Sequence, residues 1–99
     1  MRANSPGVYV ILNKISGRRY IGSSRRVISR INSHISNLKA SRHRNKELQK
    51  DFNNMGLEAF SFSVLAYGSL QKISKVEMET IDLSDNLYNI RNNSYLRVL

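Results

Sequence analysis

The pattern of apolar and polar residues near the start of the chain predicts two β-strands. The segments GVYVIL (residues 7–12) and RRYIGS (residues 18–23) are rich in β-branched and aromatic residues, and Gly17 lies in the connection between them. We therefore expect a β-hairpin. Because consecutive residues of the first segment are apolar, both faces of that strand should be buried, and the sheet should be covered on both sides.

The apolar spacing then changes to that of a helix over about residues 27–40. The apolar residues that recur at this spacing are Val27, Ile31, Ile35 and Leu38. A second helix is predicted over about residues 45–54, because Gly56 follows at the place of a C-cap glycine.

The second half of the chain predicts one more strand and one more helix. AFSFSVLAY (residues 59–67) alternates apolar and polar residues, as a strand does. Ser69 is placed to cap a helix over residues 70–83. LYNI (residues 87–90) ends the predicted compact unit, so we expect one domain over residues 1–90 and a tail or linker over residues 91–99. A chain of 99 residues has room for one modest core.

The charge of the chain is strongly positive and unevenly distributed. Sixteen Lys and Arg against seven Asp and Glu give a net charge of +9. Residues 14–50 hold eleven of the sixteen basic residues and one acid, Glu47, whereas acids outnumber bases by six to four from residue 51 onward. A one-sided positive field suits a phosphate backbone. A solvated basic surface that maintains solubility is the alternative.

Several classes of protein are excluded by composition. There is no cysteine, which excludes a disulfide framework and a thiolate zinc site, and two histidines are too few for a histidine-rich metal site. The apolar run VYVIL is too short for a signal peptide or a membrane span. The basic segments also lack the bulky apolar face with tryptophan of a membrane-surface helix. We therefore expect a cytoplasmic protein without a membrane partner.

Two short motifs carry a resemblance to a known family. GVY at residues 7–9, followed at the right distance by YIG at residues 20–22, resembles the signature of the GIY-YIG nuclease family. Val8 replaces an isoleucine of that signature, a change between two β-branched residues. FNNMGLEAFSFSVL (residues 52–65) is similar to the linking helix and third strand of phage homing endonucleases and related nucleases.

Further residues agree with the resemblance, which covers about residues 6–90. Arg30 follows YIG early in the next predicted helix, and His34 lies one turn further on. Glu77 lies in the last predicted helix, and its spacing to Asn89 matches the spacing between a glutamate and an asparagine in the family.

The resemblance implies an α/β protein of the α+β type. Its three-stranded antiparallel sheet would be flanked by helices, in the order β-β-α-α-β-α. It also implies a divalent-metal-dependent endonuclease that hydrolyses DNA phosphodiester bonds, in a bacterial cell or a phage-infected host. In this family the tyrosine of the first motif, here Tyr9, is a proposed general base, and the tyrosine of the second, here Tyr20, lies beside the attacked phosphate.

Glu77 is the candidate metal ligand. On the predicted helix it falls within the apolar stripe, whereas Glu79 points away from it. A carboxylate on a buried face must be paired, metal-bound or protonated. A hard oxygen ligand suits Mg²⁺ or Mn²⁺, whose remaining positions are taken by water and substrate phosphate. The alternative is a partly buried salt bridge to an arginine.

Arg30 and His34 are candidates on the first helix. Arg30 lies at the edge of the apolar stripe, and its guanidinium could bind phosphate oxygens in a bidentate manner. The alternative is an ordinary exposed arginine. His34 could orient or deprotonate the tyrosine or the water, or it could be a structural hydrogen-bonding residue.

The arginines near the hairpin could act on the ionisation of its two tyrosines, Tyr9 and Tyr20. A phenol titrates near 10, and we expect Arg30 and a metal ion to favour the phenolate and lower the pKa of Tyr9. The alternative for each tyrosine, and especially for Tyr20, is a core residue with its hydroxyl at the surface.

The remaining candidates support the site or bind DNA. Gly22 would permit a close approach of the backbone to substrate or a bend at the strand end. Asn89 would fix the chain after the last helix through side-chain hydrogen bonds. The residues that we expect to contact phosphates without regard to sequence are Arg18, Arg19, Arg25, Arg26, Arg42, Arg44 and Lys46.

Two classes of function follow from these residues. The first is a metal-dependent endonuclease, and the second is a catalytically weak nucleic-acid-binding module on the same fold. The combination of Tyr9, Tyr20, Arg30 and Glu77 favours the endonuclease, because a binding module has no need of the buried acid. The small domain has no predicted recognition helix, so specificity would require a second domain, a partner chain or a particular DNA structure. Cleavage of both strands would require a homodimer or two successive events.

Overall fold

The computed structural model of the chain describes residues 4–89 and confirms the expected order of elements. These are β1 (Gly7–Asn13), β2 (Arg19–Ser24), α1 (Val27–Lys39), α2 (Lys46–Met55), β3 (Phe60–Tyr67) and α3 (Leu70–Leu83). The predicted tail, residues 91–99, lies outside the described residues. The predicted boundaries agree to within one residue, because each segment changes its apolar period where the element ends.

The three strands form one antiparallel sheet in the order β2-β1-β3, as expected. The central strand β1 is hydrogen-bonded to a strand on each side, and the side chains of its near-continuous apolar run are buried or half-buried. In the β1–β2 register Tyr9 lies opposite Gly22, and Ile11 lies opposite Tyr20. One edge of the sheet is therefore β2, the strand that carries the YIG motif.

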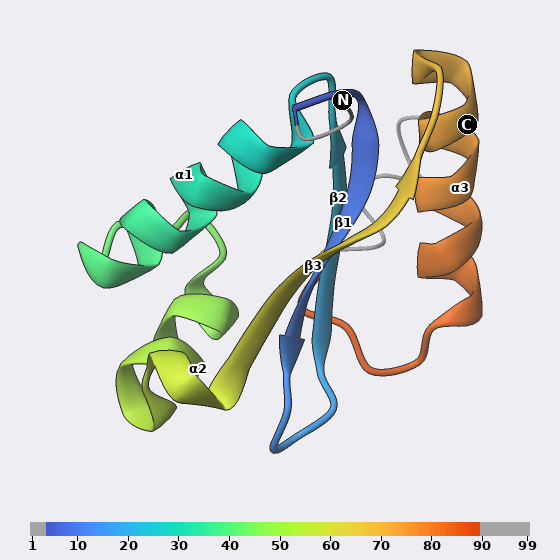
Figure 1. Cartoon of the computed structure of the whole chain (residues 1–99). Coiled ribbons are helices and arrows are strands. Elements are labelled where there is room, and N and C mark those ends of the chain that lie inside the picture. The colour runs from blue at the N-terminus through green and yellow to red at the C-terminus, as the bar shows by residue number, and fades with distance from the viewer. Residues whose placement is uncertain (1–3, 90–99) are drawn as a thin grey trace.

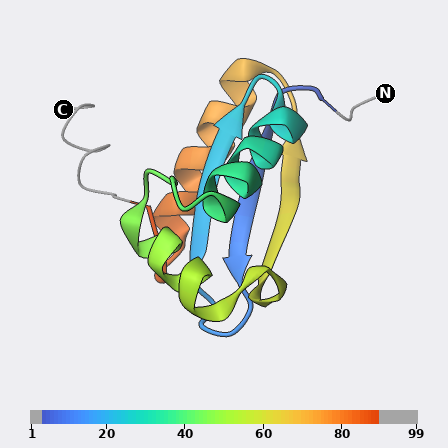
Figure 2. The same ribbon diagram turned by 90° about the vertical axis from the view of Figure 1, so that its left-hand side faces the viewer.

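Helices cover both faces of the sheet, which confirms the prediction from the apolar character of β1. Helices α1 and α2 lie on one face and α3 on the other (Figure 1). Turned by 90°, the molecule shows α1 and α2 in front of the sheet and α3 behind it (Figure 2). The larger apolar cluster contains Tyr9 and Ile11 of β1, and the smaller one contains Val8 of β1 with Ile21 and Ile73.

The helix ends follow the expected capping chemistry. Ser69 accepts a hydrogen bond of 3.2 Å from the Lys72 amide and caps α3. Gly56 follows α2 with a φ of 87°, a conformation that favours glycine. Asn45, which we placed inside the second helix, is instead its N-cap and accepts from the Leu48 amide at 3.0 Å.

The segment after α3 returns to the hairpin. Leu87 forms an isolated parallel bridge with Arg19 of β2. The hydroxyl of the buried Tyr88 donates to an Asp51 carboxylate oxygen at 2.6 Å and accepts from the side-chain nitrogen of Asn13 at 3.0 Å. These contacts attach the segment to both the hairpin and α2. Within residues 4–89, no helix is both long and apolar enough to span a lipid bilayer.

Candidate active site

Tyr9 and His34 form the centre of the candidate site. Tyr9 points from β1 toward α1 because side chains alternate across a strand, and it is 2% exposed. His34 lies on the buried face of α1 with Ile31 and Leu38 and is 4% exposed. The Tyr9 hydroxyl and the His34 Nε2 atom are 2.6 Å apart, a hydrogen-bonding distance. The structure thus joins two residues that the sequence singled out separately.

A second histidine, His43, extends this pair and was missed from the sequence. His34 Nδ1 and His43 Nε2 are 2.7 Å apart, and the two rings are stacked with centroids 4.9 Å apart. The chain has only two histidines, and they lie nine positions apart. That spacing was the one signal in the sequence that could have suggested a contact between them. The second histidine, however, follows the helix in a basic loop with no periodic pattern.

Tyr20 packs against both histidines. Its ring meets the His34 ring edge-on at 5.3 Å between centroids and the His43 ring at 5.9 Å. Tyr20 is half-buried on β2 and faces the same side of the sheet as Tyr9. The rings of Tyr9, Tyr20, His34 and His43 thus form one aromatic cluster, called the cluster below. The packing of Tyr20 also fits the alternative of an amphipathic core residue.

Arg30 is exposed on α1, yet its positive charge lowers the pKa values of all four side chains of the cluster. Burial outweighs the lowering effect of the nearby Arg30 side chain and raises the pKa of Tyr9 to about 12. Burial likewise raises the pKa of Tyr20, against the lowering effect of Arg30. Our expectation of a lowered Tyr9 pKa is therefore wrong for the protein alone: the arginine acts in the expected direction, but desolvation of the phenolate outweighs it.

Both histidines are held in the neutral form at neutral pH. Burial, together with the neighbouring His43 and the Arg30 charge, lowers the pKa of His34 from its ordinary value of 6.5 to about 4. Burial also lowers the pKa of His43, and the charges of Arg30 and Arg44 act in the same direction. A buried site beside the positive charge of Arg30 disfavours a second positive charge on a histidine ring.

Glu77 lies across the edge strand from this cluster. Ile21 and Ser23 of β2 face α3, and the Ser23 hydroxyl donates to the Glu77 carboxylate at 2.5 Å. Glu77 is half-buried and Glu79 is exposed, in agreement with the predicted helix register. The Glu77 charge contributes to the raised pKa of both Tyr9 and Tyr20.

The alternative of a salt bridge at Glu77 is not observed, because no ion pair to this carboxylate is found within residues 4–89. In the same part of the chain, no group of three or more His, Asp or Glu side chains is gathered in a way that could hold a metal ion. Any ion at Glu77 would have to fill most of its coordination sphere with water and substrate oxygens.

Gly22 lies against Tyr9 and does not mark a strand end, whereas its expected close approach to substrate stays a prediction. A Cβ atom at this position would overlap the Tyr9 hydroxyl, since Tyr9 lies opposite Gly22 and its ring crosses that point of β2. The strand also continues to Ser24 without ending at Gly22. The glycine therefore makes room for a residue of the protein itself.

Asn89 behaves as expected and fixes the chain after α3. Its side-chain oxygen accepts from the Ile21 amide at 2.9 Å, and its side-chain nitrogen donates to the Ile21 carbonyl at 2.8 Å. These two bonds hold the returning segment to the β2 backbone between Tyr20 and Gly22, so Asn89 supports the strand that carries the site.

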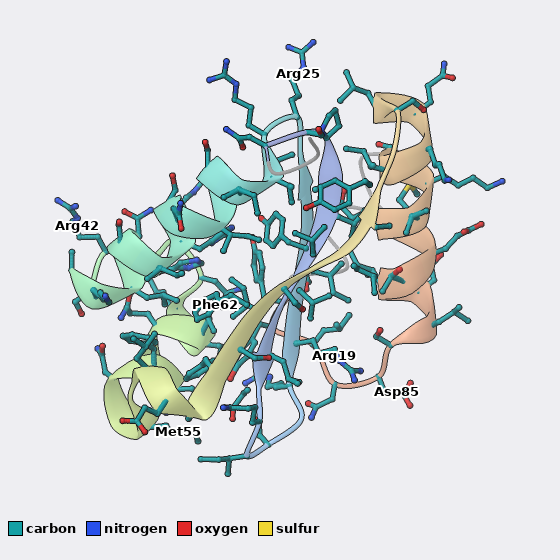
Figure 3. The ribbon with its side chains drawn as sticks, viewed as in Figure 1. Arg19, Arg25, Arg42, Met55, Phe62 and Asp85 are labelled. Carbon is teal, nitrogen blue, oxygen red and sulfur yellow. The ribbon has the colours of Figure 1, made fainter. Side chains whose placement is uncertain are left out.

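The basic residues proposed to contact phosphates do not form one patch. Arg19, Arg25 and Arg42 project from separate parts of the molecule (Figure 3). Arg18 is already engaged, because it pairs with Glu47 at 3.1 Å and lies over the Tyr88 ring at 4.4 Å. Arg18 is thus a structural contact of the returning segment in this state. The other basic candidates are exposed; they are Arg19, Arg25, Arg26, Arg42, Arg44 and Lys46.

Comparison with known proteins agrees with this fold. The catalytic domain of the homing endonuclease I-TevI superposes with a TM-score of 0.73 at 26% identity, over 87% of this chain and 98% of that domain. An I-TevI mutant domain gives a TM-score of 0.71 at 27% identity, over 86% and 92%. A probable intron-encoded endonuclease 1 from Neurospora crassa is 32% identical over 94 residues.

The match to the fungal protein covers 86% of this chain but 30% of that protein's length. The chain thus spans less than a third of this curated relative. The family of GIY-YIG catalytic domains matches residues 5–90, nearly the whole chain. Since the motifs, the fold and this match agree, the chain belongs to the GIY-YIG endonuclease family.

Proposed function

We propose that this domain is an endonuclease that hydrolyses phosphodiester bonds in DNA with the help of a divalent cation. The observation that carries the proposal is the hydrogen-bonded pair of Tyr9 and His34 with the Arg30 charge beside it. A module that only binds nucleic acid does not need a buried phenol and a neutral histidine at this distance. The names of the relatives, a homing endonuclease and an intron-encoded endonuclease, support the same class of reaction.

Hydrolysis of a phosphodiester requires two contributions from the site and one from the solvent. A water molecule must lose a proton as its oxygen bonds to phosphorus, and the phosphate must be stabilised as negative charge develops. The bond from phosphorus to the leaving oxygen breaks, and that oxygen takes a proton from solvent water and departs as an alcohol. We assign the first task to Tyr9, whose phenolate would accept the proton of the water. Arg30 is assigned the second task, because its guanidinium is always charged and matches two phosphate oxygens.

Glu77 fits the requirements of a divalent-cation ligand. It offers a half-buried carboxylate that has no ion pair among residues 4–89 and accepts a hydrogen bond from Ser23 at one oxygen. Hard oxygen ligands of this kind suit Mg²⁺ or Mn²⁺, which keep several waters and share substrate oxygens. A cation bound there would supply Lewis-acid stabilisation of the phosphate and favour the Tyr9 phenolate.

Tyr20 and His34 complete the proposed site. Tyr20 packs on both histidines from the edge strand, which supports a place beside the attacked phosphate. Arg44 also acts on the Tyr20 ring, where its charge lowers the pKa of that phenol. Phosphate near Tyr20 would therefore meet arginines from both α1 and the loop that follows it.

We further propose that DNA specificity comes from outside this domain. Its exposed arginines are spread over several faces, which suits contacts to a backbone more than contacts to bases. A second domain, a partner chain or a second copy would then supply sequence choice, and a homodimer could cut both strands. A cytoplasmic setting in a bacterium or a phage-infected cell remains part of this proposal.

A plasmid-nicking assay tests the proposal. Supercoiled DNA is incubated with the protein in Mg²⁺, in Mn²⁺ and in a chelator, and Tyr9→Phe is compared with the parent. Tyr88→Phe is the control, because it also removes a buried hydroxyl with two hydrogen bonds, outside the cluster. We expect nicking with either metal, none with the chelator, and none with Tyr9→Phe.

Thermal melts of both variants separate chemistry from folding. Tyr88→Phe should melt at a lower temperature and still nick DNA. Retained nicking in Tyr9→Phe would contradict the assignment of the general base. DNA binding without nicking by the folded parent would favour the alternative of a binding module.

A further inference from the structure

The polar atoms of Tyr9, His34 and His43 form a continuous chain that ends on the backbone. The Tyr9 hydroxyl contacts His34 Nε2 at 2.6 Å, and His34 Nδ1 contacts His43 Nε2 at 2.7 Å. The Asn45 amide then donates to His43 Nδ1 at 3.0 Å. Each histidine thus uses both ring nitrogens in hydrogen bonds, and the last group in the chain is the backbone N–H of Asn45.

A backbone N–H can only donate, and this sets the direction of every bond in the chain. His43 Nδ1 accepts from Asn45, so the proton of a neutral His43 ring must be on Nε2. His43 Nε2–H then donates to His34 Nδ1, which leaves the His34 proton on Nε2. His34 Nε2–H in turn donates to the Tyr9 oxygen.

We propose that His43 is a positioning residue: held by the Asn45 amide, it fixes His34 in the Nε2–H tautomer, so that His34 donates a hydrogen bond to the Tyr9 oxygen. The assignment of protons follows from the geometry, and its meaning for catalysis rests on the proposed function. His34 is then unable to accept the Tyr9 proton, which removes one of the two catalytic roles considered for it.

The proposed direction matters because it favours the phenolate. A hydrogen bond donated to an ionisable oxygen stabilises its charged form, whereas one accepted from the hydroxyl stabilises the neutral form. Burial disfavours the Tyr9 phenolate, so a donor at 2.6 Å acts against that penalty. The remaining lone pairs of a Tyr9 phenolate stay available to accept the proton of the attacking water.

The surroundings of His43 hold it firmly in this orientation. The buried Gln49 accepts from the His43 amide at 2.9 Å and donates to the Leu38 carbonyl at 3.0 Å. The loop after α1 is thereby attached to both helices. Both histidines are neutral at neutral pH because burial lowers their pKa values, so each ring carries a single proton and has a defined tautomer.

Nitrogen-15 NMR of the two histidines tests the proposal on the whole chain at pH 7, without DNA or metal. Two-bond correlations from the ring carbon protons distinguish an Nε2–H ring from an Nδ1–H ring, and His43→Ala assigns the two spin systems. We expect both rings as Nε2–H in the parent. An Nδ1–H ring at His34 would overturn the proposal.

Two substitutions at Asn45 test the origin of the tautomer. Asn45→Ala loses the side chain but keeps the amide, whereas Asn45→Pro loses both, and the φ of −83° at this N-cap is close to that of proline. We expect His34 to stay Nε2–H in Asn45→Ala and to populate Nδ1–H in Asn45→Pro. An unchanged Nε2–H ring in a folded Asn45→Pro would overturn the role of the backbone.

His43→Ala supplies the same test if the proline variant does not fold. Without His43 the His34 tautomer should become mixed, and an unchanged Nε2–H ring would overturn the proposal. In the nicking assay we expect kcat of His43→Ala to fall by about tenfold or more with KM little changed, as for other residues that orient a histidine. Absence of nicking in the parent would contradict the proposed function, while the NMR result would still decide the tautomers.

Discussion

Ser23 on β2 and Glu77 on α3 are joined by a hydrogen bond of 2.5 Å, donated by the serine hydroxyl to the carboxylate. The bond crosses from the edge strand to the helix on the opposite face from Tyr9. It places the acid at the edge of β2, where its charge still acts on Tyr9 and Tyr20. A candidate metal ligand on one face of the sheet and a candidate base on the other are thus brought together around a single edge strand.

Glu77→Gln should abolish metal-dependent nicking, whereas Glu79→Gln should change it little. The two residues lie about 200° apart around the helix axis, at about 100° per residue, and only Glu77 is half-buried against β2. The measurement is nicking rate against Mg²⁺ concentration, with thermal melts of both variants. An active Glu77→Gln beside an inactive Glu79→Gln would show that the metal site has been misplaced.

Arg30→Ala should reduce turnover by about 100-fold or more, because a charge that stabilises the transition state is lost. DNA affinity should change little, since Arg30 would be one phosphate contact among many. Lys39→Ala is the matched control, as it removes one exposed positive charge from the same helix. Single-turnover rates and DNA affinities of both variants check this, and activity of Arg30→Ala within a few-fold of the parent would refute the assignment.

Gly22→Ala should destabilise the domain by about 1–3 kcal/mol, the usual cost of overpacking a core. The added methyl group would overlap the Tyr9 hydroxyl across the strand pair. Urea unfolding of Gly22→Ala alone and combined with Tyr9→Phe measures the effect. A smaller loss in the Tyr9→Phe background is expected, and equal losses in both backgrounds would mean that the Tyr9 ring carbons, and not its hydroxyl, carry the clash.

The domain should lose stability between pH 7 and pH 5 through His34. The unfolded chain binds a proton at this residue near the ordinary pKa of 6.5, but the folded protein does so only near a pKa of about 4. The unfolded state therefore binds more protons in that window, so stability falls as pH falls, by about 2 kcal/mol from this residue. Urea unfolding at several pH values should show a flatter profile for His34→Gln, and an unchanged slope would argue against a buried neutral histidine.

DNA binding should weaken steeply with salt and show little sequence preference. Each neutralised phosphate contributes about −0.9 to the slope of log K against log salt concentration. Arg25→Ala should reduce the slope by about 1, because Arg25 is exposed and projects freely (Figure 3). Arg18→Ala should leave the slope nearly unchanged, since Arg18 is paired with Glu47. If Arg18→Ala reduced the slope more than Arg25→Ala, the proposed DNA-binding residues would be wrong.

Much of the fold and part of the candidate site could be predicted from local sequence. Helical and strand periods are local properties, so the element order and the bounds of α3 follow from residues such as Ile73 and Ile81. The same periodicity separated Glu77 from Glu79 without any tertiary information. Asn89 could be assigned to the end of the domain because its spacing from Glu77 matches the family.

Only the tertiary structure decided the role of residues whose partners lie far along the chain. His43 reaches His34 because Gln49 and Asn45 hold the loop, and no local pattern encodes that contact. Gly22 accommodates Tyr9 because the two lie opposite each other in the sheet.

The pKa of Tyr9 depends in the same way on the whole environment. The sequence showed arginines close to the tyrosine and therefore suggested a lowered pKa. In the fold, removal of the phenol from water raises the pKa by more than the Arg30 charge lowers it. Charge can be counted along a sequence, but desolvation arises only when distant segments pack around a group, and here it is the larger of the two effects.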